Sequence, residues 1–164
     1  MFSRCFEDLF FVFFLPRFAR SEKESLRAPK KVYLVDTGLA LFSRKEAGRD
    51  MENAVFLELL RRKHYTNPLM EIHYYGGSGE KEVDFVVSES GRVVELIQVT
   101  LSLEDARERE ILALTRASKT LNCKNLTVVT LDEEGIVESD GRKIRVVPLW
   151  KFLLGVSLDN YLIQ

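Results

Sequence analysis

The chain has few of the features that mark specialised classes of protein. Its two cysteines, Cys5 and Cys123, lie far apart and outside any Cys-x-x-Cys pair. This argues against a zinc site and favours reduced thiols in the cytosol, so we expect a cytoplasmic protein. Neither sign of charge is in excess, because 24 basic residues oppose 25 acidic ones. This balance gives no support to a protein that coats DNA, although local basic patches remain open.

Long apolar runs are missing as well. The membrane-like stretch at residues 9–15, LFFVFFL, is far shorter than the roughly 20 residues that a spanning helix needs. Acidic residues precede it and no small-residue cleavage site follows, so it does not resemble a signal peptide.

A phosphate-binding loop is also absent. The glycine-rich stretch at residues 76–81, GGSGEK, places Glu80 before Lys81, has no following hydroxyl residue and leads into a predicted strand. A phosphate loop needs G-x-x-x-x-G-K-[ST] at the start of a helix, where backbone N–H groups surround the phosphate. We interpret the stretch as a hairpin loop and expect no ATP site in this chain.

What is present predicts one globular domain of 164 residues with a short appendage. Phenylalanines at helical spacing (Phe2, Phe6, Phe10, Phe13 and Phe14) predict an N-terminal helix that ends at Pro16. This aromatic face either packs on the core, faces a domain outside this chain, or forms a homodimer. The charged residues 20–31 indicate a surface linker, so we divide the chain into an appendage (1–29) and a domain (30–164).

The domain reads as an α/β fold. Helices are predicted over 51–62, with Asp50 as N-cap, from Ser102 onward, and over 150–154. Strands are predicted over 31–36, 72–75, 82–87, 93–100, 125–131, 136–139 and 143–147, the last two joined by the turn at Asp140 and Gly141. This order predicts a mixed central sheet flanked by helices.

Two carboxylates in apolar surroundings are the main chemical signal. Glu52 shares a helical face with apolar residues at i+3, i+4 and i+7, and Asp84 lies within the apolar strand VDFVV. A carboxylate in such a place needs a partner or a ligand. If the hairpin between strands 82–87 and 93–100 has an odd loop, Gln98 shares the face of Asp84; an even loop places it on the other face. Glu58, by contrast, matches Arg62 at i+4 and suggests a solvated ion pair.

These residues carry a resemblance that covers residues 30–154. The strings PKKVYLVDTGLA, ENAVFLELLRRK, KEVDFVV, ELIQVTLSLED, REREILAL and VVPLWKFLL resemble the C-terminal domain of archaeal AAA-type ATPases, a PD-(D/E)XK nuclease-like domain. The resemblance implies a restriction-endonuclease-like core and a larger protein whose ATPase part is absent here.

The resemblance also implies roles for four residues. Glu52 matches the helix glutamate and Asp84 the strand aspartate of a site that binds Mg²⁺, a hard cation that prefers oxygen ligands. Gln98 stands for the second acid and Thr100 for the lysine, so one negative charge and the ammonium are lost. Lys81 and Arg107 are alternative sources of an ammonium or guanidinium. We expect a degenerate catalytic site, with Glu52, Asp84 and Gln98 as candidate ligands of Mg²⁺.

Basic residues beside this site are candidates for DNA contact. Arg61 and Arg62 end the helix that carries Glu52, and Arg107 and Arg109 alternate with glutamates in the helix after the site. We expect a module that binds DNA or a partner for its ATPase. The alternatives are an active Mg²⁺-dependent deoxyribonuclease and a structural domain that oligomerises the ATPase.

Overall fold

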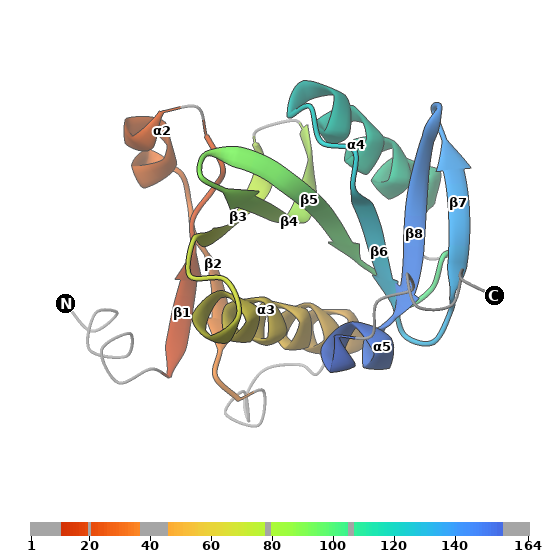
Figure 1. Ribbon diagram of the computed structural model, residues 1–164, viewed down its shortest axis with the longest axis horizontal. Helices are drawn as coiled ribbons and strands as arrows, with labels where there is room; N and C mark the ends of the chain where they lie inside the picture. Colours follow the sequence, from red (N-terminus) through yellow and green to blue (C-terminus); the bar gives the residue numbers. More distant parts are fainter. Residues whose placement is uncertain (1–10, 20, 37–45, 78–79, 105–106, 156–164) are drawn as a thin grey trace.

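The computed structural model describes residues 11–19, 21–36, 46–77, 80–104 and 107–155 (Figure 1). Its centre is a sheet of six strands in the order β3-β4-β5-β6-β8-β7. These strands are β3 (Met70–Gly77), β4 (Glu80–Glu89), β5 (Arg92–Val99), β6 (Leu126–Thr130), β7 (Gly135–Ser139) and β8 (Arg142–Pro148). The pairs β5–β6 and β6–β8 are parallel and the other pairs antiparallel, which confirms the predicted mixed sheet.

Helices cover both faces of this sheet. Helix α3 (Ala47–Tyr65) and the short α5 (Leu149–Leu154) lie on one face, and α4 (Arg107–Thr120) lies on the other (Figure 1). Each face has its own apolar cluster, one that includes Phe56 and Phe85 and one that includes Leu114 and Val86. The strands are buried on both faces where helices cover them, as in β6, whose five residues are all buried. This layering confirms the predicted α/β class and is compatible with a restriction-endonuclease-like core.

The hairpin turns follow from local sequence. Asp140 and Gly141 join β7 to β8 with φ angles of 50° and 71°, the left-handed conformation that a two-residue hairpin turn requires. Ser90 and Gly91 join β4 to β5 in the same way, with φ angles of 50° and 77°. The turn at Asp140 and Gly141 was predicted from the sequence, as was a hairpin between the strands 82–87 and 93–100, whose loop is shorter than the predicted strand ends imply.

The aromatic N-terminal segment differs from the prediction. Val12–Leu15 is a strand, β1, that pairs antiparallel with β2 (Lys31–Leu34), so the predicted helix is wrong over these residues. Phe13 and Leu15 pack on the core cluster, which is the alternation of a strand. A short apolar run is compatible with the periodicity of a helix and with that of a strand, and here the Val and Phe residues favour a strand. The rest of the predicted helix, including Phe2, Phe6 and Phe10, lies outside the described residues.

The predicted linker contains a helix. Residues Glu22–Arg27 form α2, with the Ser21 hydroxyl accepting a hydrogen bond from the N–H of Glu24. Leu15 is buried in the same cluster as α3, so the segment before this helix packs on the core of the chain. No helix in the described ranges has the length and apolar character to cross a membrane.

A β-bulge in β4 positions one of the candidate site residues. His73 pairs with Val86 but Tyr75 pairs with Val83, so β4 holds one residue more than β3 between these pairs. Val83 and Val86 belong to the cluster under α4, whereas Phe85 belongs to the cluster under α3. The extra residue breaks the alternation of the strand, and a bulge of this kind re-aims a side chain. Asp84 lies at this irregularity.

Candidate functional site

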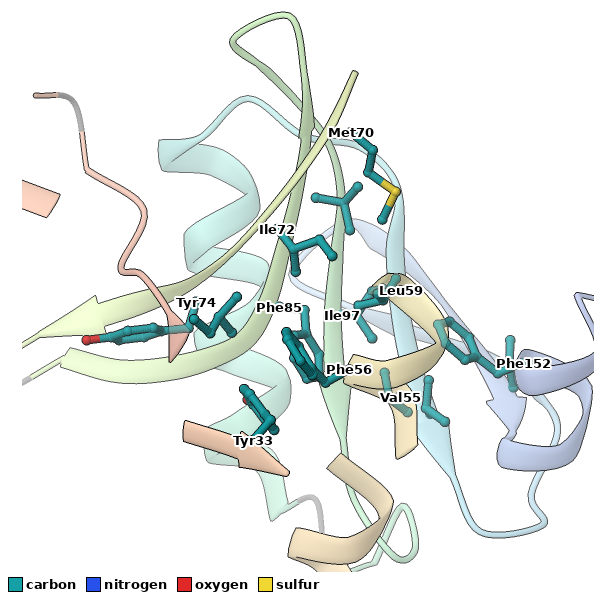
Figure 2. Packing of buried hydrophobic residues seen from close by; sticks show 14 residues of the cluster. Tyr33, Val55, Phe56, Leu59, Met70, Ile72, Tyr74, Phe85, Ile97 and Phe152 are labelled. Atoms are coloured by element: carbon teal, nitrogen blue, oxygen red, sulfur yellow. The ribbon is translucent and has the colours of Figure 1, made fainter. Parts of the chain in front are cut away.

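Glu52 lies on the face of α3 that packs on the sheet. Val55, Phe56 and Leu59 of the same face are buried, which confirms the predicted apolar stripe (Figure 2). The helix begins at Ala47 rather than after Asp50, which lies in the first turn, where a negative charge is favourable beside the N-terminal N–H groups. The Glu52 carboxylate is thereby held at the border between the core and solvent.

Tyr33 orients that carboxylate. Its hydroxyl donates a hydrogen bond of 2.6 Å to Glu52 Oε1, and its ring stacks on Phe56 with centroids 4.2 Å apart. Burial, followed by the charge of Glu52, raises the pKa of the Tyr33 hydroxyl far above its ordinary value. Tyr33 therefore remains a hydrogen-bond donor to Glu52.

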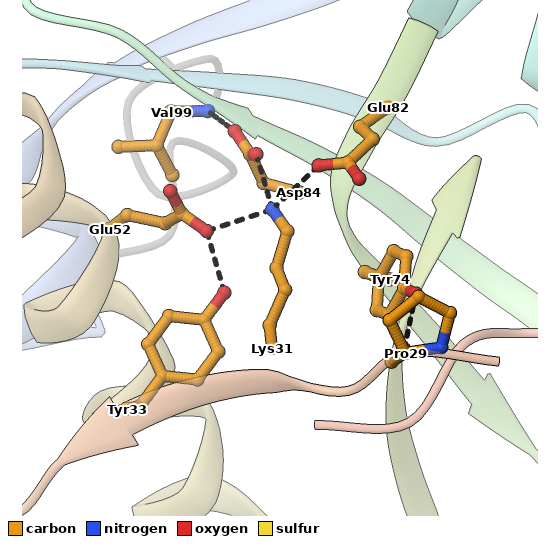
Figure 3. Close-up of polar contacts among 8 residues, drawn as sticks. All are labelled: Pro29, Lys31, Tyr33, Glu52, Tyr74, Glu82, Asp84 and Val99. Atoms are coloured by element: carbon orange, nitrogen blue, oxygen red, sulfur yellow. Dashed lines mark hydrogen bonds and ion pairs between the residues drawn. The ribbon is translucent and has the colours of Figure 1, made fainter. Parts of the chain in front are cut away.

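The ammonium of Lys31 lies between Glu52 and Asp84 (Figure 3). Lys31 Nζ is 3.0 Å from Glu52 Oε1 and 3.1 Å from Asp84 Oδ1. Glu82 adds a third carboxylate, with Oε2 at 3.4 Å from the same nitrogen. The four side chains come from β2, α3 and β4, so this lysine-centred cluster exists only in the folded chain.

Backbone and charge both act on Asp84. The N–H of Val99 donates to Asp84 Oδ2 over 3.0 Å, so each oxygen of this carboxylate has a partner. Burial raises the pKa of the Asp84 carboxyl to about 6, and the nearby charge of Glu52 acts in the same direction. The Lys31 ammonium and the Val99 N–H oppose this shift, because both favour the charged form.

Lys31 is held in its charged form. Burial by itself lowers the pKa of the ammonium, but the charges of Asp84 and Glu52 outweigh that effect. The pKa of Lys31 consequently stands above its ordinary value. Sequence reasoning missed both Lys31 and Glu82. The available signal was the position of Glu82 two residues before Asp84, which places both on the same face of a regular strand. No comparable signal pointed to Lys31, because its neighbour Tyr33 was itself not among the predicted site residues.

Gln98 lies on the other face of the sheet. It pairs with Val128, and Leu96, two residues earlier, pairs with Leu126. These three partners and neighbours of Gln98 (Leu96, Leu126 and Val128) belong to the cluster under α4. Side-chain alternation along β5 places Gln98 with them, away from Glu52. The turn before β5 has two residues, Ser90 and Gly91, but a register shift between Val87 and Ser88 offsets this even loop, so that Val86 pairs with Leu96. Asp84 and Gln98 would then share a face in a regular ladder, and the bulge at Asp84 is what separates them.

The two substituted positions are both buried. Among the described residues, Gln98 Oε1 has no hydrogen-bond partner, and the Thr100 hydroxyl donates to the carbonyl of Ser102 over 3.1 Å. The structure thus brings Glu52 and Asp84 together but not Gln98 or Thr100 with them.

The donor set does not fit the Mg²⁺ that the resemblance implies. Lys31 Nζ is within hydrogen-bond distance of both carboxylates assigned to the ion. Within the described ranges, no three His, Cys, Asp or Glu side chains are arranged as a metal-ligand set. The present arrangement is built around an ammonium.

The predicted DNA-contacting arginines are engaged with a buried acid. Glu58 is only 6% exposed, so the predicted solvated ion pair is wrong. It accepts hydrogen bonds from Arg61 Nε at 2.6 Å and Arg62 Nε at 2.8 Å. Burial acts to raise the pKa of Glu58, but these hydrogen bonds outweigh it and the pKa is lowered. Arg62 also donates to the Phe152 carbonyl and lies over that ring, joining α3 to α5.

Arg61 keeps about half of its side chain exposed. Arg107 and Arg109 belong to the first turns of α4, and their side chains, like that of Lys81, lie outside the described part of the chain.

Comparison with known proteins gives a family and a relative. The family model of a domain of unknown function, DUF4143, matches residues 47–152. A protein of Methanocaldococcus jannaschii that is described only as uncharacterized is 37% identical over 159 residues. That alignment covers 91% of this chain and 34% of the relative, so the chain spans about a third of its length.

Proposed function

Because the chain belongs to the DUF4143 family, we propose that it is a nuclease-fold module that does not cleave DNA but binds DNA or a protein partner for an ATPase. One observation carries the proposal: Lys31 Nζ lies between the two carboxylates that would have to hold a catalytic cation. Metal-dependent hydrolysis of a phosphodiester needs a cation there to polarise the phosphate and activate water. An ammonium supplies one positive charge but no open coordination position.

The substituted positions support the same proposal. A carboxylate at residue 98 and an ammonium at residue 100 are both lacking, and Gln98 lies on the face of the sheet opposite to Glu52. Three features of a hydrolytic centre are thus missing together: the second acid, the lysine and a free position between the remaining acids.

An ATPase as partner agrees with the length of the relative. About two-thirds of the M. jannaschii protein extends beyond the region matched here, which leaves room for further domains. The ATPase assignment itself rests on the resemblance described above.

The test of this proposal is cleavage. Supercoiled plasmid and branched DNA, incubated with the protein and Mg²⁺ or Mn²⁺, should remain intact. Asp84→Ala is the matched control, because it removes an acid that any metal-dependent mechanism here would need. Cutting by the wild type that Asp84→Ala abolishes would refute the proposal and establish a deoxyribonuclease.

Salt dependence distinguishes DNA from a protein as the ligand. If DNA is bound through phosphate contacts, Arg61→Ala should reduce the slope of log affinity against log salt by about one. Arg61 suits this test because its side chain is about half exposed. DNA affinity that does not respond to salt would exclude phosphate contacts and favour a protein partner.

A further inference from the structure

The six-stranded sheet ends in two edge strands, β3 and β7, which differ in how the described chain covers them (Figure 1). At β3, the N–H of Phe18 donates to the Tyr74 carbonyl over 2.7 Å, and the N–H of Tyr74 donates to the Pro16 carbonyl over 3.1 Å. The chain thus closes this edge with a segment of its own. No described segment pairs with the outer edge of β7, where every second residue directs its N–H and C=O groups away from β8.

An apolar groove lies beside this open edge, between β7 and α4. Leu103, which precedes α4, and Ile111 and Leu112 of the helix line it together with Val137 of β7. Val137 faces α4 because its partner on β8, Ile144, is buried in the cluster under that helix. The Leu112 side chain is 37% exposed, so part of the apolar lining is open to solvent. A strand added to β7 would place every second side chain in this groove.

The charges around the groove are negative. The described residues along it include two acids, Glu104 and Glu138, and no basic residue. Glu133 lies at the same end as Leu103, because its carboxylate accepts a hydrogen bond from the N–H of that residue. Side-chain alternation directs the Glu138 carboxylate to the other face of β7, where 72% of its side chain is exposed and Lys143 is 4.0 Å away. An added strand would therefore meet apolar side chains on one face and a carboxylate on the other.

We propose that a protein segment docks on the outer edge of β7 as an additional strand, with apolar side chains in the groove and Lys or Arg at the alternating positions beside Glu138. Main-chain hydrogen bonds give such added strands their affinity, and pockets for alternate side chains give specificity. Opposite charges directly across two strands are favourable, whereas these acids repel the phosphates of DNA. The inference rests on the proposed function and specifies the class of its protein partner.

A designed peptide tests this inference. The probe is a blocked peptide of alternating lysine and valine, added to the isotope-labelled full chain and followed by the amide chemical shifts in NMR. The shifts should change in β7 and around Leu112 but not in β3, whose outer edge is already paired. Two control peptides, alternating glutamate and valine or alternating lysine and serine, should bind at least about tenfold more weakly, because each lacks one of the two complementary features.

Variants of the protein assign the effect to the groove. Leu112→Ser should weaken binding of the lysine–valine peptide about tenfold, because an apolar side chain of the groove is lost. The matched control is Leu69→Ser, which replaces a leucine that is 70% exposed beside β3 and should bind as the wild type does. Glu138→Gln should weaken binding about threefold at low salt and less at high salt. This exposed position also serves as the test if Leu112→Ser does not fold.

Several results would overturn the inference. They are a lysine–valine peptide that does not bind, equal binding of the glutamate–valine peptide, and displacement of the peptide by duplex DNA. A wild-type dimer in sedimentation that Leu112→Ser dissociates would do so too, because a second copy would then occupy the groove. None of these measurements concerns cleavage, so the proposed absence of nuclease activity is tested separately by the DNA assay.

Discussion

At the scale of single residues, two buried acids of this chain are neutralised by different means. Glu58 has two arginines from its own helix, three and four residues away, and the sequence predicted the pairing with Arg62. Asp84 has a lysine that lies 53 residues earlier in the chain. The first arrangement is local and ties the end of α3 together, whereas the second depends on how three elements pack.

Glu58→Gln should destabilise the protein by about 2 kcal/mol, because charge-assisted hydrogen bonds to a buried group are lost from Arg61 and Arg62. Urea unfolding measures this loss. The matched control is Glu138→Gln, since Glu138 and Lys143 are 4.0 Å apart and both largely exposed. That change should stay within about 0.5 kcal/mol. Equal effects of the two substitutions would mean that Glu58 is a solvated acid after all.

Asp84 should titrate well above an ordinary aspartate, with a pKa of about 6. Carbon-13 NMR of its carboxyl group measures this value directly. Glu52→Gln removes a negative charge that raises this pKa, so the Asp84 pKa should fall in that variant. A midpoint near that of a free aspartate in the wild type would contradict the burial of this carboxyl beside Glu52.

The sign of the associated stability change follows from proton linkage. The folded state binds the Asp84 proton more tightly than the unfolded chain, because the folded pKa is raised. This group therefore favours folding at low pH, and its contribution is lost as the pH rises from about 4 to about 6. The stability of Asp84→Asn relative to the wild type should increase over that interval, as urea unfolding at several pH values would show.

At the scale of elements, the bulge in β4 and the contact between α3 and α5 organise the α3 face of the sheet. The bulge allows Asp84 to meet residues on the α3 side while Val83 and Val86 stay in the cluster under α4. Helix α5 is short and contributes one buried side chain, Phe152, to the core. The Arg62 guanidinium carbon lies 4.3 Å from the centroid of that ring.

Phe152→Ala should cost about 3 kcal/mol in the free energy of unfolding, since it leaves a cavity between α5 and α3 and removes the contact with Arg62. Chemical denaturation checks the value. Trp150→Ala on the same helix is the control, because about half of that side chain is exposed. A loss as large for Trp150→Ala would show that α5 is held by a different face.

At the scale of the whole molecule, two apolar clusters on either side of one mixed sheet make a single layered structure. Both ends of the glycine-rich stretch belong to this sheet, since β3 ends at Gly77 and β4 begins at Glu80. Helix α4, with its N-terminal N–H groups, follows β5 instead. The arrangement is therefore a hairpin and not a strand–loop–helix unit for phosphate.

Isothermal titration with Mg-ATP should consequently detect no binding by this chain, because the strands on either side of the stretch, β3 and β4, pair antiparallel and β3 leads to no helix N-terminus that could hold a triphosphate. Micromolar affinity would contradict this expectation. ADP and GTP serve as further probes, since a general phosphate site would bind all three.

The sequence alone determined the local features of the molecule. Asp140 and Gly141 adopt a turn that few other pairs accept, the spacing of Glu52 with Val55, Phe56 and Leu59 predicts one helical face, and alternating valines predict strands. Such features depend on residues a few positions apart, so their physical cause is contained in short segments. The class of fold follows from their order along the chain.

Only the tertiary structure decided which residues form the candidate site. Lys31 lies 53 residues before Asp84, and no local pattern indicates that these two side chains meet. The bulge at Asp84 changes the face of the sheet on which the carboxylate lies. Side-chain alternation along the strand cannot predict this face, because the extra residue interrupts the alternation. The strand Val12–Leu15 likewise required β2 as a partner, since a short apolar run has no preferred period until another strand supplies its hydrogen bonds.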